Sequence, residues 1–183
     1  MERSTHHGSE DAAPAPWHDD IYEALKRATV RLVPYVPDGG HARLISRIHA
    51  DPAMRGIVLT TEEEGVAIAC GAWLGGERAV VLMQSSGVGN CINMLSLVAN
   101  CRFPFVALVA MRGEWAELNQ WQVPMARAAP GALELMGITV MRAERAEEVG
   151  GIVEAGLASA FDGDQAVAVL LAQRLIGRKA WTR

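Results

Sequence analysis

The sequence has 183 residues, of which 50% are hydrophobic, and it carries a formal net charge of −4 with a pI near 5.7. This length and apolar content predict a globular domain with a full-sized core, and the acidic balance is ordinary for a soluble cytoplasmic protein. The sequence has neither a basic stripe with interleaved aromatic residues nor an apolar run of about 20 residues, which argues against nucleic acid and membranes as partners.

The amino-terminal part of the chain changes character after residue 16. Residues 1–16 are polar and contain prolines without any period, so we expect a flexible arm there. Residues 17–183 are then expected to form one domain. Its first elements are an amphipathic helix over residues 19–28, an extended segment over residues 33–36 and a short helix over residues 41–49.

The middle of the chain alternates between strands and helices. We expect a β-branched strand over residues 56–60, a helix of small residues from Glu62, and a strand over residues 79–83. A glycine-rich turn over residues 85–90 then leads into a helix over residues 91–100. The second of these strands is apolar on both faces, which is typical of an interior strand in a parallel sheet.

The alternation continues towards the carboxyl terminus. Strands are expected over residues 105–110, 138–141 and 166–171, with a helix over residues 146–161. A long irregular stretch over residues 111–130 interrupts the pattern, and loops of that length are usually functional or flexible. The order of the elements predicts an α/β fold, in which a doubly wound parallel sheet of about six strands carries helices on both faces.

Three consecutive glutamates follow the strand expected at residues 56–60, at the sheet edge where such folds bind ligands. In one interpretation Glu62, Glu63 and Glu64 form a solvated first helical turn that the helix dipole stabilises. In the other, a carboxylate at the tip of a buried strand is desolvated and shares a proton with a ring nitrogen of a bound heterocycle.

Two further segments leave alternatives open. The turn over residues 85–90, SSGVGN, could present backbone N–H groups to a phosphate, or its glycines could let a ring approach the backbone. His41 follows the expected turn at residues 37–40, so a role in a site is open to it. Trp115 and Trp121 in the irregular stretch could pack internally or anchor an interface.

Four segments resemble the pyrimidine-binding domain of the thiamine diphosphate-dependent decarboxylases, and the likeness extends over roughly residues 17–175. Within that family the similarity is greatest to the decarboxylases of sulfopyruvate and phosphonopyruvate. The segments are YVPDGG from Tyr35, TTEEEGVAIACGAW from Thr60, VLMQSSGVGNCINML from Val81, and the pair MRGEW from Met111 and QVPMARAAP from Gln122.

The resemblance implies a role for Glu62. In the family a glutamate lies nine residues before the glycine of a Gly-Tyr-Ala-like segment, and counting back from Gly71 selects Glu62, with Glu63 as the fallback if the register slips. This carboxylate would hydrogen-bond N1′ of the aminopyrimidine of thiamine diphosphate and favour its imino tautomer. The remaining residues implied on the pyrimidine side of the cofactor are Gln84, Ser85, Gly87, Gly89 and Asn90.

The substrate implied by the resemblance is a small anionic 2-oxo acid. Arg112 and Arg127 are candidates to contact its sulfonate or phosphonate group, although both could equally form surface ion pairs. Asp38 and His41 are further candidates for substrate contacts. No metal ligand is expected in this chain.

The resemblance also points to a missing part. Family enzymes bind the diphosphate and Mg²⁺ through a second domain with a Gly-Asp-Gly run, whereas this chain has only Asp162-Gly163-Asp164, which we interpret as a solvated turn. We therefore expect a separate beta subunit that carries the diphosphate-binding domain and holds Mg²⁺.

The expected function is that of the alpha, pyrimidine-binding subunit of a lyase. Such an enzyme decarboxylates a 3-substituted pyruvate, such as sulfopyruvate or phosphonopyruvate, to the aldehyde and carbon dioxide. The alternative is a non-catalytic scaffold or regulatory protein that assembles with a partner subunit. A nucleotide-binding domain is a weaker alternative, because it needs an acidic residue about 20 positions after the glycine turn and residues 100–110 contain none.

Overall fold

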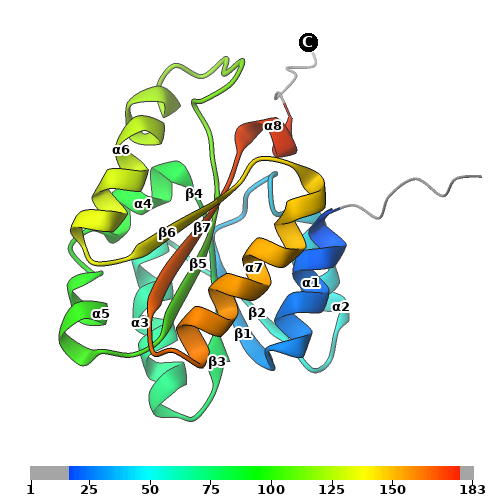
Figure 1. The fold of residues 1–183 in the computed structure, drawn as a ribbon, viewed down its shortest axis with the longest axis vertical. Helices are drawn as coiled ribbons and strands as arrows, with labels where there is room; N and C mark the ends of the chain where they lie inside the picture. Colours follow the sequence, from blue (N-terminus) through cyan, green and yellow to red (C-terminus); the bar gives the residue numbers. More distant parts are fainter. Residues whose placement is uncertain (1–16, 178–183) are drawn as a thin grey trace, which may run out of the picture.

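Seven parallel strands lie at the centre of the protein (Figure 1), in a computed structural model that describes residues 17–177. The strands are β1 (Val30–Tyr35), β2 (Arg55–Val58), β3 (Arg78–Ala79), β4 (Val81–Gln84), β5 (Phe105–Ala110), β6 (Thr139–Ala143) and β7 (Ala166–Leu171). Their order is β2-β1-β4-β5-β7-β6, and β3 pairs with β1. The predicted α/β fold with a parallel sheet is confirmed.

Helices cover both faces of this sheet. They are α1 (Trp17–Arg27), α2 (Ala42–Ala50), α3 (Glu62–Leu74), α4 (Ser85–Cys91), α5 (Ser96–Cys101), α6 (Gln122–Leu135), α7 (Ala146–Phe161) and α8 (Gln173–Ile176). Figure 1 shows α1, α2 and α7 on one face and α3 to α6 on the other. Each group of helices packs on its own apolar cluster, so the sheet separates two halves of the core.

The strand β5 shows why the central strands are continuously apolar. All six of its residues are buried. Val106 and Leu108 belong to the cluster beneath α1 and α7, whereas Phe105, Ala107 and Val109 belong to the cluster beneath α3 to α6. Because successive side chains point to opposite faces, a strand covered on both sides needs an apolar residue at every position.

Several elements begin or end a few residues from their predicted bounds, and the structure differs most from the prediction in two regions. Residues 85–90 are not a turn but lie in helix α4, and the helix predicted over residues 91–100 is replaced by a turn followed by α5. The glycines misled the prediction, because neither Gly87 nor Gly89 has a positive φ. The irregular stretch is also shorter than predicted, since α6 already begins at Gln122 and its Pro124 lies in the first turn, where a missing N–H costs little.

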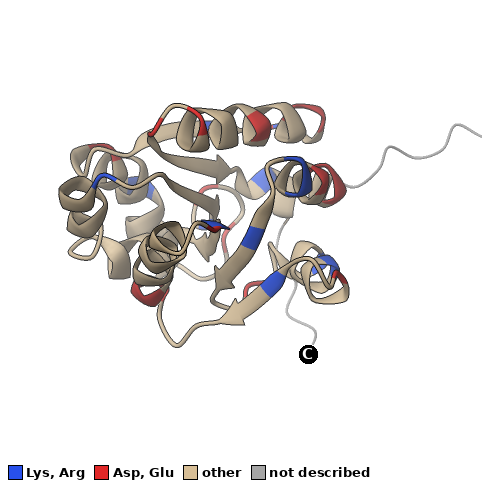
Figure 2. Ribbon diagram, turned by 90° about the horizontal axis from the view of Figure 1, so that it is seen from below, with Lys and Arg blue, Asp and Glu red and all other residues tan. Residues whose placement is uncertain are grey.

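Two expectations concern the chain as a whole. Among residues 17–177 no helix combines the length and the apolar character that crossing a membrane requires. Figure 2 shows basic and acidic residues distributed over several helices and strands rather than collected on one element. The predicted arm at residues 1–16 lies outside the described residues, and so does the end of the predicted domain at residues 178–183.

The close contact between α3 and the sheet makes a prediction about stability. A Cβ added at Gly65 would lie 2.8 Å from Val81 Cγ1 and 3.1 Å from Leu59 Cδ1, whereas a Cβ at Gly71 in the same helix meets nothing within 4 Å. Both changes to alanine gain helix propensity of up to about 1 kcal/mol. We expect the free energy of unfolding of Gly65→Ala to be about 1–3 kcal/mol below that of Gly71→Ala in urea titrations, because only the first overpacks the core. Equal midpoints with equal slopes would contradict this account of the packing.

Candidate active site

The candidate site lies at the carboxyl ends of the strands, at the upper edge of the sheet in Figure 1. The chain passes from β1 outward to β2 and then returns to place β4 on the other side of β1. The connections after β1 and β4 therefore leave the sheet in opposite directions and open a crevice between them. Ligands of doubly wound sheets bind at such a switch point.

Glu62 is the buried acid beside this crevice. It is the first residue of α3, and only 6% of its surface is exposed. Asn90 Nδ2 of α4 donates a 2.7 Å hydrogen bond to Glu62 Oε2. A Cβ on Gly87, in the same helix, would lie 2.5 Å from Glu62 Oε1. Glycine at this position thus leaves room for the carboxylate, and Asn90 orients it.

The structure separates the three consecutive glutamates. Glu62 is buried and Glu63 is half-buried, whereas Glu64 is exposed. Glu64 Oε2 accepts a 2.9 Å hydrogen bond from the backbone N–H of Thr60, so it stabilises the start of the helix. Glu64 therefore agrees with the interpretation as a solvated first helical turn, and Glu62 agrees with the interpretation as a buried carboxylate.

The other predicted cofactor residues of α4 are placed by packing. Ser85 is fully buried, and its Oγ accepts a 3.1 Å hydrogen bond from the backbone N–H of Arg112. A Cβ on Gly89 would lie 3.1 Å from Met125 Sδ of α6. Both glycines allow close packing, but the groups that approach their backbone are the Glu62 carboxyl group and the Met125 thioether rather than a ring.

A cavity of about 430 Å³ opens between the ends of β1, β4 and β5, and of the predicted cofactor residues only Gln84 lines it. Its lining includes two predicted substrate residues, Asp38 and Arg112, together with the predicted cofactor residue Gln84. Arg112 Nη2 lies 3.7 Å from Asp38 Oδ1, and both side chains are largely buried. Asp38 Oδ2 also accepts a 3.0 Å hydrogen bond from the backbone N–H of Gly40, which fixes the carboxylate.

Sequence reasoning did not select three polar residues that also line this cavity, namely Glu117, Asn119 and Gln122. For Glu117 and Asn119 the only signal was their place in the irregular stretch after β5, whereas Gln122 also begins one of the segments that carry the family resemblance. Burial raises the pKa of Glu117, but hydrogen bonds from the backbone N–H groups of Asn119 and Gly113 and from the Gln173 side chain, together with the Arg112 guanidinium, outweigh it and lower the pKa overall. Glu117 is therefore a carboxylate at neutral pH.

Gln122 also carries a buried acceptor without a partner. Its Oε1 forms no hydrogen bond within residues 17–177. A polar atom buried in this way is costly unless something else satisfies it. Gln122 lines the cavity, but this oxygen is itself buried and offers the cavity no accessible acceptor.

His41 lies beneath the cavity rather than in it. It is fully buried, and its Nε2 lies 3.2 Å from the carbonyl oxygen of Met83, to which it must donate. Burial lowers the pKa of His41, and the nearby Asp38 offsets only part of this effect, so the ring is neutral at pH 7. His41 thus ties the connection after β1 to the end of β4.

Other sequence candidates lie away from the cavity. Arg127 is exposed on α6 and is not among the residues that line the cavity. The turn at residues 162–164 precedes β7 and so lies at the opposite edge of the sheet, where Asp162 pairs with Arg78 at 3.4 Å. Trp121 is 87% exposed, so internal packing is the wrong interpretation for this side chain.

Known proteins similar to this chain include the sulfopyruvate decarboxylase subunit alpha of Methanothermobacter thermautotrophicus. It is 34% identical over 156 residues, which cover 82% of this chain and 92% of that subunit. The phosphonopyruvate decarboxylase of Streptomyces viridochromogenes is 38% identical over 104 residues, which cover 56% of this chain and only 26% of that enzyme. No protein-family model matches the chain.

A solved structure has the same fold. It is a 2-oxoglutarate:ferredoxin oxidoreductase from Magnetococcus marinus, which aligns with a TM-score of 0.67 over 88% of this chain and 29% of that chain. The sequence identity is 14%, so this likeness concerns the fold alone.

The contact between Gly87 and Glu62 predicts a measurable coupling. Gly87→Ala should lower the free energy of unfolding by about 1–3 kcal/mol, because its Cβ displaces the Glu62 side chain. In a Glu62→Ala background the same change should cost at least about 1 kcal/mol less. The control is Gly131→Ala in α6, whose Cβ meets nothing within 4 Å and which should show no coupling to Glu62→Ala. Denaturant unfolding of the wild type, the three variants and the two controls measures this, and additive effects at Gly87 would exclude the contact.

Proposed function

Because this chain belongs to the family of the sulfopyruvate decarboxylase alpha subunits, we propose that it is the pyrimidine-binding subunit of a thiamine diphosphate-dependent 2-oxo acid decarboxylase. The substrate class is a 3-substituted pyruvate with an anionic head group, such as sulfopyruvate or phosphonopyruvate. The observation that carries the proposal is the buried Glu62, which is oriented by Asn90 and faces the glycine backbone of α4.

The donor set of this chain fits the aminopyrimidine of thiamine diphosphate. Glu62 Oε2 is occupied by Asn90, whereas no hydrogen bond from the described residues reaches Oε1. The missing Cβ of Gly87 leaves room for the Glu62 carboxyl group itself, because a Cβ there would lie 2.5 Å from Oε1. A desolvated carboxylate with one free oxygen can hold a hydrogen bond to a ring nitrogen.

When bound, thiamine diphosphate supplies a carbon nucleophile and an electron sink for the loss of carbon dioxide. The role of this chain is to bind and orient the aminopyrimidine of the cofactor. Glu62 holds the proton shared with the ring nitrogen N1′, and Asn90 keeps the carboxylate in one orientation. Gln84, Ser85, Gly87 and Gly89 form the wall on the pyrimidine side.

The substrate contacts of the proposal are in the cavity between β1, β4 and β5. We assign the anionic head group to Arg112 rather than to Arg127, because Arg112 lines the cavity and Arg127 is exposed on α6. Asp38 lies opposite Arg112 and sets the direction of its guanidinium. His41 supports the cavity floor from below and is not proposed to touch substrate.

The proposal includes a second polypeptide. A beta subunit would carry the diphosphate-binding domain and Mg²⁺, and the cofactor would lie between the two chains. The name of the relative, an alpha subunit, supports such a partner. The turn at residues 162–164, at the sheet edge opposite Glu62, offers no substitute for the diphosphate site. In this proposal the two subunits form a soluble complex in the cytoplasm.

A non-catalytic scaffold is the alternative function. It would be favoured by an exposed Glu62 or by a side chain that fills the space beside it. Glu62 is instead buried. Of the two residues expected as candidates to fill the space, Trp73 is 37% exposed, whereas Met83 is buried in the apolar cluster beneath α3 to α6. The geometry therefore supports the enzyme.

The test is a titration of thiamine diphosphate and Mg²⁺ into this chain, alone and mixed with the diphosphate-domain subunit. We expect binding by calorimetry in the mixture only, together with decarboxylation of sulfopyruvate or phosphonopyruvate. Glu62→Gln should lower kcat by a factor on the order of 10² to 10⁴, because the amide cannot share the proton.

The matched control is Glu63→Gln, which removes a neighbouring half-buried carboxylate and should leave activity close to that of the wild type. Tight cofactor binding by this chain alone would contradict the two-subunit site. Absence of binding in the mixture would favour the scaffold.

A further inference from the structure

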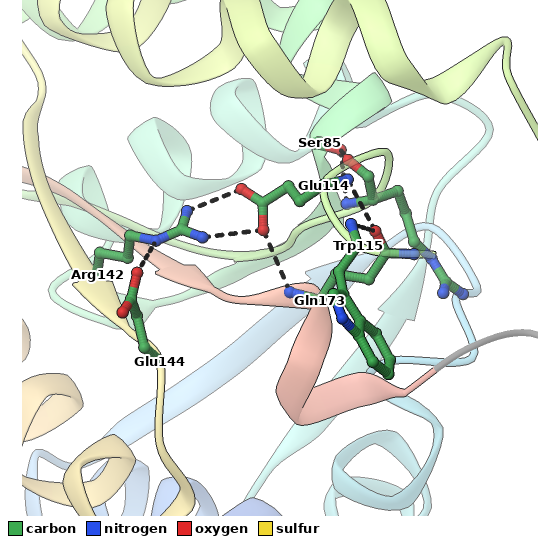
Figure 3. A network of polar contacts seen from close by, with 7 residues as sticks. Ser85, Glu114, Trp115, Arg142, Glu144 and Gln173 are labelled. Atoms are coloured by element: carbon green, nitrogen blue, oxygen red, sulfur yellow. Dashed lines mark hydrogen bonds and ion pairs between the residues drawn. The ribbon is translucent and has the colours of Figure 1, made fainter. Parts of the chain in front are cut away.

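One buried side chain, Gln173 at the start of α8, holds the loop at residues 111–121 by hydrogen bonds (Figure 3). Only 1% of Gln173 is exposed. Its Oε1 accepts hydrogen bonds from the backbone N–H groups of Glu114 at 2.8 Å and Trp115 at 2.9 Å. One amide oxygen thus fixes two successive peptide groups of the loop.

The nitrogen of the same amide holds a second part of the loop. Gln173 Nε2 donates a 2.8 Å hydrogen bond to Glu117 Oε2. Glu117 in turn accepts from the backbone N–H groups of Gly113 at 3.2 Å and Asn119 at 2.9 Å. Gly113 has φ +76°, and a Cβ there would lie 2.6 Å from the carbonyl oxygen of Gln122, so the loop folds back tightly onto α6.

A third anchor comes from the outermost strand of the sheet. Arg142 of β6 donates two hydrogen bonds of 2.9 Å to the carboxylate of Glu114, and its Nε donates to Glu144 at 3.1 Å. Glu114 Oε2 also accepts from the backbone N–H of Gln173 at 3.3 Å. Figure 3 shows these side chains converging on the loop from β6 and α8.

The anchored loop is the one that carries Arg112. At its start, the backbone N–H of Arg112 donates to Ser85 Oγ. Two residues later, the Gln173 contacts begin. Arg112 is therefore fixed between the cofactor side of the site, through Ser85, and the carboxyl-terminal helix, through Gln173.

We infer that Gln173 is a positioning residue that sets the place of Arg112 in the cavity and thereby the affinity for the substrate's anionic group. This inference rests on the proposed function of the site. The amide is needed in both its halves, because it accepts from the loop backbone and donates to Glu117 at the same time. An ionised carboxylate of the same shape can only accept.

Gln173→Glu is the informative variant. The introduced carboxylate would face the carboxylate of Glu117, where Gln173 now places a donor, and the carboxylate of Glu114 is also close. The positive charges nearby are already paired: Arg142 binds Glu114, and Arg112 lies near Glu117 and Asp38. Repulsion should loosen the loop at pH 8, and because burial and the neighbouring carboxylates raise the pKa of the introduced group, its protonation at lower pH should restore the donor. Exposed Arg174 is adjacent in α8 and is unchanged in both states.

In the reconstituted two-subunit enzyme, we expect Gln173→Glu to raise KM for sulfopyruvate at pH 8 on the order of 10- to 100-fold. Its effect on kcat should be smaller, and the ratio of variant to wild-type KM should fall as the pH approaches 6. A purely structural defect would instead reduce the active fraction and leave KM unchanged. Amide hydrogen exchange of residues 112–119 in the full chain should be faster in the variant at pH 8.

Two further variants complete the experiment. Gln165→Glu, an exposed position at the opposite edge of the sheet, is the control and should behave as the wild type. Arg142→Gln removes the two hydrogen bonds that hold Glu114 from β6, so it should also raise KM. This variant tests the inference independently if Gln173→Glu folds poorly.

The outcomes separate this inference from the proposed function. An active wild-type enzyme in which Gln173→Glu and Arg142→Gln keep a normal KM and normal loop exchange overturns the positioning role alone. An inactive wild-type mixture overturns the function, and the exchange measurement still decides whether Gln173 holds the loop.

Discussion

The candidate site depends on the close contact between the Glu62 carboxylate and the backbone of α4 at Gly87, where a glycine provides no side chain. Glu62 at the start of α3 lies against Gly87 of α4, and Asn90 of the same helix orients it. The small residues of α3, such as Gly65, bring that helix close to β4. Any side chain at Gly87 would displace the Glu62 carboxylate. The position of this carboxylate therefore depends directly on how closely α3 and α4 pack.

A second set of contacts controls the neighbouring cavity. Asp38, Arg112 and Glu117 place one guanidinium between two carboxylates, so the direction of Arg112 matters more than any excess of positive charge. Ser85 and Gln173 hold the backbone on either side of it. The loop after β5 is therefore a fixed wall between the proposed cofactor side and the proposed substrate side.

Much of the fold could be predicted because its signals are local. The strands at residues 105–110 and 166–171 and the helix at residues 146–161 have the predicted bounds, since apolar runs and helical periodicity are properties of short segments. The glycines of residues 85–90 were misread, because glycine is used both for turns and for close approach, and only the neighbouring element decides which. Glu117 and Asn119 escaped selection because nothing in a polar loop shows which side chains face inward, and Gln122 escaped it because the start of α6 was not predicted.

The sequence by itself determined the parallel α/β fold and the family resemblance, and it singled out Glu62 as the candidate acid, because each depends on short runs of residues. Only the tertiary structure decided which glutamate is buried, why Gly87 is a glycine and which arginine lines the cavity. It also brought Gln173 to the loop after β5, although many residues separate them along the chain. These relations depend on the order in which strands pair across the sheet, and strand order places together residues that no local pattern connects.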